Sequence, residues 1–203
     1  MAKLISADLT NNKLCILEYT TTDGQMLSFK EDAFDAKIVS HTYTDIGKVI
    51  FDKPITRIGE WAFYNRTRLT SVNIPDSVTT IGDRAFWECT SLTSVTIPDS
   101  VTTIGYGAFC DCSSLKSVTI PDSVTTIKTN AFWGCSSLTS VTIGKSVRTI
   151  DERAFKDCNI DTIVCCPEIP PKINDSFDRF ENLIVPKGCE EAYAKSDWGQ
   201  YLE

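Results

Sequence analysis

The most reactive side chains of this sequence are cysteines, one histidine and a set of repeated aspartates. The chain has 203 residues, among them nine cysteines and a single histidine, His41. Cysteine and histidine can hold zinc or act in nucleophilic catalysis, and a row of aspartates can bind calcium. For each group, the spacing along the chain decides between this chemistry and a structural role.

Four cysteines recur at a fixed interval, which favours a structural role. The interval is 23 residues for Cys89, Cys112, Cys135 and Cys158. A zinc site needs ligands that converge on one point, whereas equivalent positions of a repeat point in parallel. Paired CxxC motifs are absent, and an odd number of cysteines cannot pair completely within one chain. We therefore interpret these thiols as small buried apolar side chains.

The histidine and the repeated aspartates also lack the neighbouring residues that catalysis or metal binding would need. His41 lies in the segment SHTYTD, with no catalytic-triad signature around it. Asp76, Asp99 and Asp122 each follow a proline, as expected of tight turns, and no calcium-binding loop surrounds them. We therefore predict no catalytic residue, no metal site and no cofactor, and we do not expect an enzyme.

The elements that carry these residues form an internal repeat of 23 residues. The period is visible at apolar positions. These are Leu69, Leu92, Leu115 and Leu138; Val72, Val95, Val118 and Val141; Ile74, Ile97, Ile120 and Ile143; and Phe86, Phe109, Phe132 and Phe155. A weaker copy precedes them from Ile46, and a decayed one follows from Ile160. Such a period is the signature of a solenoid, in which stacked coils bury a common core.

One repeat unit is predicted to contain two short extended segments and a plug, which is a buried Ala-Phe pair that fills the core of the coil. Leu92, Val95 and Ile97 alternate with polar residues, which predicts a strand with one buried face. A Pro-Asp turn, a second apolar pair and the buried Ala108-Phe109 follow.

Exposed solenoid ends need caps. Residues 13–29 predict a hairpin that turns at Asp23-Gly24, and residues 188–198 predict a closing helix. We therefore expect one domain, with an N-terminal hairpin cap at 1–45, a solenoid at 46–182 and a strand-helix cap at 183–203.

The unit LTSVTIPDSVTTIGxxAFxxC resembles the BspA-type leucine-rich repeat, over roughly residues 46–182. The resemblance implies a β-rich, right-handed leucine-rich-repeat solenoid of the α/β-horseshoe-like superfamily. It also implies a bacterial cell-surface or secreted protein, since well-studied members act as adhesins towards host matrix proteins or other cells. Two departures are Arg66, where the register calls for cysteine, and a serine in place of the usual asparagine or cysteine after the strand.

Two surfaces are candidates for partner binding. The first is the strand face, a flat row of small uncharged side chains that point outward from the predicted strands. Its members are Ser71, Asn73, Ser94, Thr96, Ser117, Thr119, Ser140 and Thr142. The second is an aromatic patch after the plug phenylalanine, formed by Tyr64, Trp87 and Trp133. A solvated strand face and aromatic cover for the plug loops are the structural alternatives.

The amino-acid composition argues against two classes of partner, nucleic acids and membranes. The net charge is −7, which disfavours nucleic acid, and no apolar run is long enough to insert into a membrane. The opening segment MAKLISADLTNN is interrupted by polar residues, so no signal peptide is predicted, and the sequence leaves the location unknown.

We expect a non-catalytic module that binds a macromolecule, adhesin-like, with a host matrix protein, a cell-surface protein or a glycan as partner. A self-assembling scaffold or spacer is the alternative, and a carbohydrate- or ice-binding solenoid is a second one.

Overall fold

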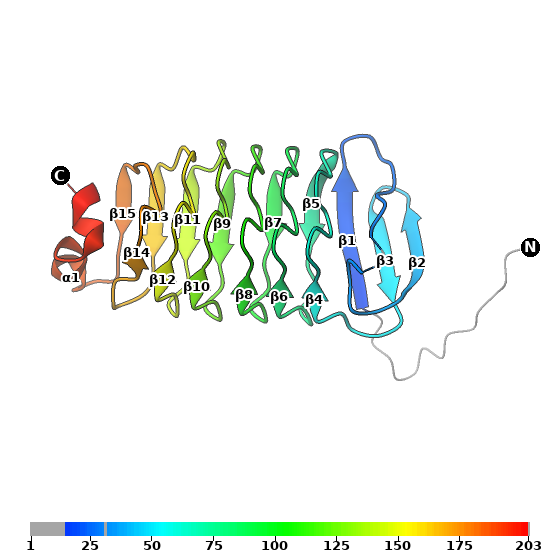
Figure 1. The fold of residues 1–203 in the computed structure, drawn as a ribbon, viewed down its shortest axis with the longest axis horizontal. Helices are drawn as coiled ribbons and strands as arrows, with labels where there is room; N and C mark the ends of the chain where they lie inside the picture. Colours follow the sequence, from blue (N-terminus) through cyan, green and yellow to red (C-terminus); the bar gives the residue numbers. More distant parts are fainter. Residues whose placement is uncertain (1–14, 31, 203) are drawn as a thin grey trace, which may run out of the picture.

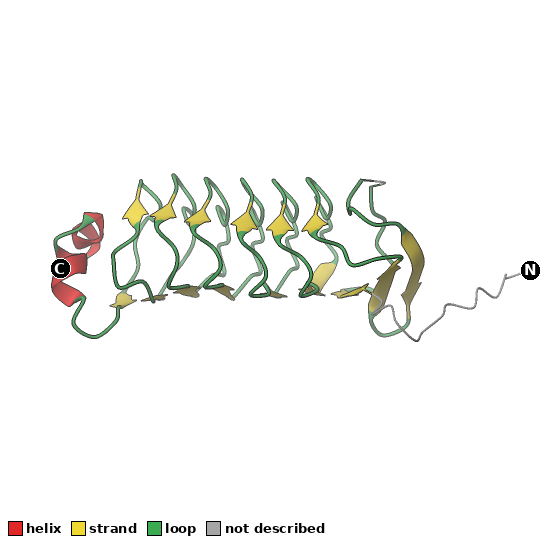
Figure 2. Ribbon diagram, turned by 90° about the horizontal axis from the view of Figure 1, so that it is seen from below, coloured by secondary structure: helices red, strands yellow, loops and turns green. Residues whose placement is uncertain are grey.

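The chain forms an elongated stack of coils with a cap at each end (Figure 1). This computed structural model describes residues 15–30 and 32–202. The opening segment, where no signal peptide is predicted, lies outside the described residues. Each coil contributes one longer strand and one two-residue strand, and the two kinds of strand lie on different sides of the solenoid (Figure 2). A leucine-rich-repeat solenoid, as the repeat predicts, is therefore the fold.

The longer strands form what we call the long-strand sheet. It contains β3 (Gly47–Phe51), β5 (Leu69–Asn73), β7 (Ser94–Thr96), β9 (Ser117–Ile120), β11 (Ser140–Ile143), β13 (Thr162–Cys165) and β15 (Asn182–Ile184). The two-residue strands form the short-strand sheet. Its members are β4 (Arg57–Ile58), β6 (Thr80–Ile81), β8 (Thr103–Ile104), β10 (Thr126–Ile127), β12 (Thr149–Ile150) and β14 (Lys172–Ile173).

Neighbouring coils pair in parallel and in the register of the repeat. Val118 lies opposite Val141, and Ile127 lies opposite Ile150, so equivalent residues of adjacent coils are direct neighbours. This register places every inward position against its own copy, because side chains of a strand alternate between two faces. The apolar positions that repeat in the sequence are consequently buried as continuous columns.

A column of phenylalanine rings runs through the core. Phe63, Phe86, Phe109, Phe132, Phe155 and Phe177 follow one another along it. Successive ring centroids are 4.8–5.2 Å apart, and the rings are within 12° of parallel. This distance matches the spacing of paired strands, so the ring stack and the backbone ladders keep the same period.

The plug loops (59–68, 82–91, 105–114, 128–137 and 151–160) add a third ladder of hydrogen bonds. In the second of them, the N–H groups of Arg84, Phe86 and Glu88 donate to carbonyls of the next coil. The two outer donors have φ values of 54° and 59°, and their counterparts in other coils share this left-handed conformation. It is costly for most side chains, at about 1–2 kcal/mol per residue. The inter-coil bonds hold it in place.

The N-terminal cap differs from the predicted hairpin at residues 13–29. The Asp23-Gly24 turn forms, but the chain after it does not return as a strand. Instead β1 (Cys15–Thr21) pairs antiparallel with both β3 and β5, so it is inserted between the first two coils. The hairpin of the cap is made by β2 (Ile38–Tyr43) and β3.

Two features explain this arrangement. The N–H of Leu27, after the turn, donates to the hydroxyl of Tyr19 rather than to the backbone of β1. Both edges of β1 are then free to form backbone hydrogen bonds with the two coils beside it, so no buried strand edge remains unpaired.

The C-terminal cap agrees with its prediction. A short helix α1 (Glu190–Ala194) and a 3-10 turn η1 (Asp197–Tyr201) close the last coil. Trp198 lies 5.4 Å from Phe177, centroid to centroid, and its indole N–H donates to the carbonyl of Pro171. Tyr193 is also buried and donates to the carbonyl of Pro167. Aromatic side chains thus cover the C-terminal end of the core, and their polar atoms remain hydrogen-bonded.

The long-strand sheet is interrupted between β7 and β9, which have no ladder between them. Lys128, in the coil that follows the interruption, also departs from the repeat. It occupies the register of Gly59, Gly82 and Gly105. A Cβ on Gly105 would lie 2.6 Å from backbone atoms of the preceding coil, so this position suits glycine where coils pack closely. Lys128 therefore places a Cβ at a position where the three coils before it have none.

We expect faster amide hydrogen exchange at this interruption. Thr139 and Asp151 donate their N–H groups to the preceding coil, whereas their counterparts one coil earlier, Lys116 and Lys128, have no such bond in the described structure. A hydrogen bond contributes about 1 kcal/mol, so exchange at Lys116 and Lys128 should be faster by roughly a factor of five. Exchange followed by NMR tests this, and equal protection at all four amides would contradict it.

Candidate functional site

The repeated cysteines are structural donors. The thiols of Cys89, Cys112, Cys135 and Cys158 donate to the carbonyls of Phe63, Phe86, Phe109 and Phe132, at 3.1–3.2 Å. All four are buried. Burial raises the pKa of the Cys89 thiol to about 12, and it raises the pKa of Cys112 and Cys135 well above the usual range. Such thiols are neither nucleophiles nor metal ligands at neutral pH.

The departure at Arg66 follows from its place at the start of the stack. Its coil has no preceding plug loop whose phenylalanine carbonyl could accept a thiol. The guanidinium Nε instead donates to the carbonyl of Ser28 in the cap, at 3.0 Å. The serine departure has a similar explanation. Ser100 donates to the carbonyl of Val78 in the preceding coil, and Ser123 does so to Val101, so hydroxyls bond the corner carbonyls.

His41 serves the packing of the N-terminal cap. Its Nε2 lies 2.6 Å from the hydroxyl of Tyr19, and its ring packs against Phe29, with 5.2 Å between centroids. Burial lowers the pKa of His41, so the neutral ring is favoured and can accept a hydrogen bond from Tyr19. The arrangement offers no nucleophile to a substrate.

The aspartates at the Pro-Asp turns are exposed and lie along one corner of the solenoid. The carboxylate of Asp122 pairs with the ammonium of Lys145 at 2.8 Å, and this cation lowers the pKa of Asp122. Within residues 15–30 and 32–202, no three His, Cys, Asp or Glu side chains gather as they would around a metal ion. The same residues contain no helix with the length and apolar character that crossing a membrane requires.

The predicted strand face lies on the outside of the long-strand sheet. Ser94 and Thr96 of β7 and Ser117 and Thr119 of β9 are exposed. Ser140 and Thr142 of β11 are half-buried, as is Ser71 of β5, while Asn73 is exposed. The interruption between β7 and β9 divides this face into two blocks.

Only part of the predicted aromatic patch comes together. Tyr64 and Trp87 flank Trp61, with ring centroids 4.9 and 6.0 Å away from it. The guanidinium of Arg84 lies over the rings of Trp61, Trp87 and Tyr106, at 4.8, 5.5 and 4.6 Å. We call Trp61, Tyr64, Arg84, Trp87 and Tyr106 the arginine-aromatic patch.

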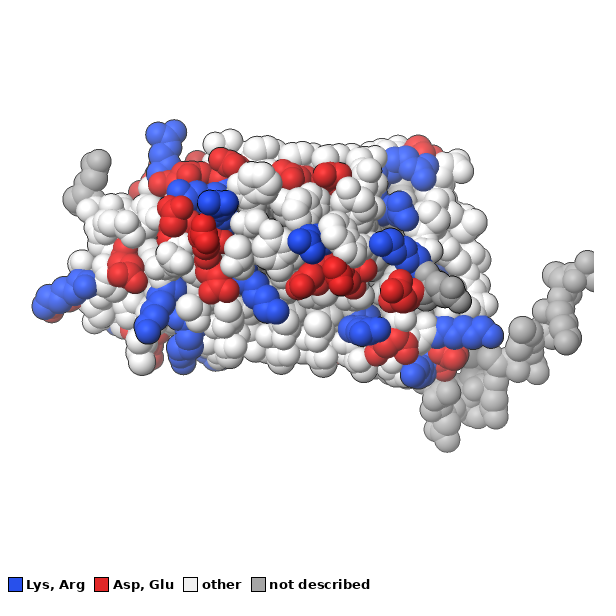
Figure 3. Space-filling model, in the orientation of Figure 1, with Lys and Arg blue, Asp and Glu red and all other residues white. Residues whose placement is uncertain are grey.

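Sequence reasoning missed Trp61, Arg84 and Tyr106 because they occupy other positions of the repeat. Trp133, the third predicted member, lies in a later coil and has no ring or cation against it within the described chain. Charged side chains of both signs are scattered over the molecule, and Figure 3 shows no continuous basic area on the face it presents.

Comparison with known proteins identifies relatives of the repeat. The family described as the BspA type leucine rich repeat region matches residues 36–161 in six copies. No curated protein matches the chain. A leucine rich repeat protein of T. pallidum is 24% identical, with a TM-score of 0.55 over 72% of this chain and 81% of that one.

A second solved structure is a leucine rich cell surface protein from Faecalibacterium prausnitzii A2-165. It is 26% identical, with a TM-score of 0.47, and the match covers 79% of this chain and 55% of that one.

Thiol labelling tests the structural role of the cysteines. Cys166 and Cys189 are half-buried, whereas the other seven are buried. We expect a thiol reagent to label at most these two in the native protein and all nine in denaturant, with mass spectrometry to locate each label. Rapid native labelling of Cys89, Cys112, Cys135 or Cys158 would contradict this role.

Proposed function

This chain belongs to the BspA-type leucine-rich-repeat family, and we propose that it is a non-catalytic module that binds protein partners. The observation that carries the proposal is a rigid stack whose repeated residues build the core, while its outward residues form two distinct surfaces. Repeat solenoids use such extended surfaces for contact.

The arginine-aromatic patch is the surface best suited to a protein partner. Tryptophan, tyrosine and arginine contribute most of the binding free energy at protein interfaces. Four rings and one guanidinium lie in contact here, and Tyr64 is 37% exposed. Their mutual packing holds the rings before a partner arrives, which reduces the entropy lost on binding.

The strand face is the second contact surface in this proposal. Its small hydroxyl and amide side chains present hydrogen-bonding groups on a flat sheet without charge. A partner that replaces their hydrogen bonds to water would avoid the larger cost of desolvating charges. An adhesin-like use towards a host matrix or cell-surface protein, with a surface or secreted location, is the specific form of the proposal that the family resemblance supports.

Self-assembly as a scaffold is a second candidate, which the ends of the long-strand sheet favour. β2 pairs with β3 and lies at the N-terminal edge of the long-strand sheet, and β15 lies at its C-terminal edge. Each exposes a large apolar side chain, Val39 at 54% and Ile184 at 53%. Open edges with apolar side chains are templates for pairing with another chain.

Binding to a panel of purified extracellular-matrix and serum proteins tests the proposal. We expect saturable binding of at least one protein. Trp87→Ala should weaken it by roughly 30-fold if the patch is the contact, since an interface tryptophan contributes about 2 kcal/mol or more. Thr96→Lys should weaken it if the strand face is the contact.

The matched control is Thr102→Lys, which places the same charge on an exposed threonine next to the short-strand sheet and should leave binding unchanged. Absence of any binding, with concentration-dependent self-association in sedimentation, would replace this proposal by the scaffold. Binding that neither variant weakens would contradict both proposed surfaces.

A further inference from the structure

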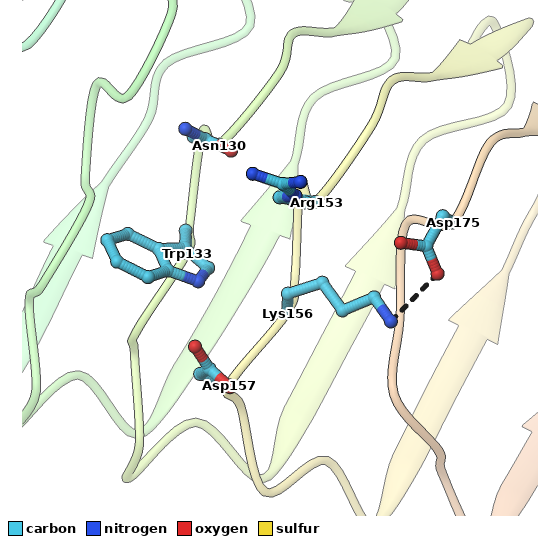
Figure 4. A pocket seen from close by; sticks show the side chains of 6 residues that line it. All are labelled: Asn130, Trp133, Arg153, Lys156, Asp157 and Asp175. Carbon is cyan, nitrogen blue, oxygen red and sulfur yellow. Dashed lines mark ion pairs between the residues drawn. The ribbon is translucent and has the colours of Figure 1, made fainter.

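A pocket lies between the plug loops of the later coils, beyond the arginine-aromatic patch. It has a volume of about 320 Å³ and is lined by Asn130, Trp133, Arg153, Lys156, Asp157 and Asp175. Figure 4 shows the indole ring of Trp133 broadside on one side of the pocket, with Asn130 and Arg153 above it and Asp157 below. An aromatic ring is thus bordered by polar groups of three kinds: amide, guanidinium and carboxylate.

The ring of Trp133 lacks the cover that its counterpart has. Trp87 holds the same position of the repeat two coils earlier, where Arg84 and Trp61 lie against it. In the register of Arg84 and Trp61, the coil of Trp133 carries the shorter Asn130, which covers less of an indole face than arginine or tryptophan does. Trp133 is half-buried, and no described ring or cation lies over it. Its face is therefore available to a ligand.

Asn130 supplies a second, independent sign of a missing partner. Its Nδ2 donates to the hydroxyl of Tyr106 at 3.1 Å, while its Oδ1 is buried without a hydrogen-bond partner. Among the described residues this is the one buried side-chain N or O atom in that condition. A buried acceptor without a donor costs about 1–3 kcal/mol, so a ligand hydroxyl or N–H would satisfy it. Figure 4 shows this oxygen on the side of Arg153.

The charges of the pocket balance. Two cations and two anions line it. Lys156 is already paired with Asp175 at 2.8 Å and with Asp178 at 3.2 Å. Arg153 has one described carboxylate partner, its neighbour Glu152 at 3.3 Å, which leaves guanidinium donors free. A phosphate or sulfate would meet the carboxylates of Asp157 and Asp175, whereas a neutral ligand with many hydroxyls would find both donors and acceptors.

We propose that this pocket binds a single neutral pyranose unit. The apolar C–H face of the sugar stacks on Trp133. One sugar hydroxyl donates to Oδ1 of Asn130 and another to the carboxylate of Asp157, while the guanidinium of Arg153 donates to a third oxygen. This site goes beyond the proposed protein contact and uses other residues, which touch the arginine-aromatic patch through the hydrogen bond from Asn130 to Tyr106.

The test follows the indole N–H signals of the protein, which has four tryptophans, in ¹H–¹⁵N NMR spectra. The probes are the methyl glycosides of glucose, galactose, mannose and N-acetylglucosamine, with glucuronic acid as an anionic comparison. At least one neutral glycoside should shift the Trp133 signal saturably, with a dissociation constant in the millimolar range, and leave the Trp87 signal in place. No shift from any neutral probe, or saturation by glucuronic acid alone, would overturn the proposal.

Matched variants separate binding from folding. Trp133→Ala should abolish saturable binding, detected by saturation transfer to the sugar, while Trp87→Ala at the equivalent position should not. Asn130→Gly removes the amide and suits the positive φ of 58°, as Gly107 does one coil earlier, and should weaken binding about tenfold. Equal effects of Trp133→Ala and Trp87→Ala would contradict the assignment.

The sugar can come from two sources, and the assay distinguishes them. Immobilised oligosaccharides that end in the same pyranose are compared with the free glycoside. Tighter binding of the oligosaccharide, still lost in Trp133→Ala, identifies the end of a glycan as the ligand. Equal affinity identifies the free sugar. Oligosaccharide binding that survives Trp133→Ala would place the site elsewhere and refute the pocket.

Discussion

The structure depends on one constraint, which is that a single coil cannot bury its own apolar face. Ordering a coil costs about 1–2 kcal/mol of backbone entropy per residue, and the burial that offsets this cost requires a neighbour. Equivalent residues must then stack at the spacing of paired strands, as the phenylalanine column does with 4.8–5.2 Å between rings. Polar inward groups obey the same rule, since the thiols of Cys89, Cys112, Cys135 and Cys158 each bond a carbonyl one coil away.

This constraint explains what could be predicted from the sequence. A fixed period assigns every residue to the inside or the outside, so the buried columns, the outward Ser94 and Thr96 and the fold class were predictable. The insertion of β1 between β3 and β5 was not, because antiparallel pairing across about fifty residues leaves no local signal. The interruption between β7 and β9 was not predictable either, because the period assigns a strand to every coil alike.

The candidate surfaces show the limit of reasoning from repeat position. Trp87 and Trp133 occupy the same register, and the sequence places both in one aromatic patch. In the structure, Trp87 joins the arginine-aromatic patch through Arg84 and Trp61, whereas Trp133 faces a pocket because Asn130 replaces the large residue beside it. The identity of the neighbouring outward residues, which no period constrains, decides what each surface can bind.

The dependence of the fold on register is tested most directly by removing one coil. Deletion of residues 92–114 joins Ser91 to Leu115 and keeps every later column in line. Deletion of residues 92–103 instead joins Ser91 to Ile104, removes the long strand of one coil and shifts the rest of that coil out of register with its neighbours. Circular dichroism and urea unfolding of the two shortened chains measure the outcome. The account predicts that the in-register deletion folds and unfolds cooperatively, with lower stability than the full chain, and that the shifted deletion does not fold. Two variants of equal stability would contradict it.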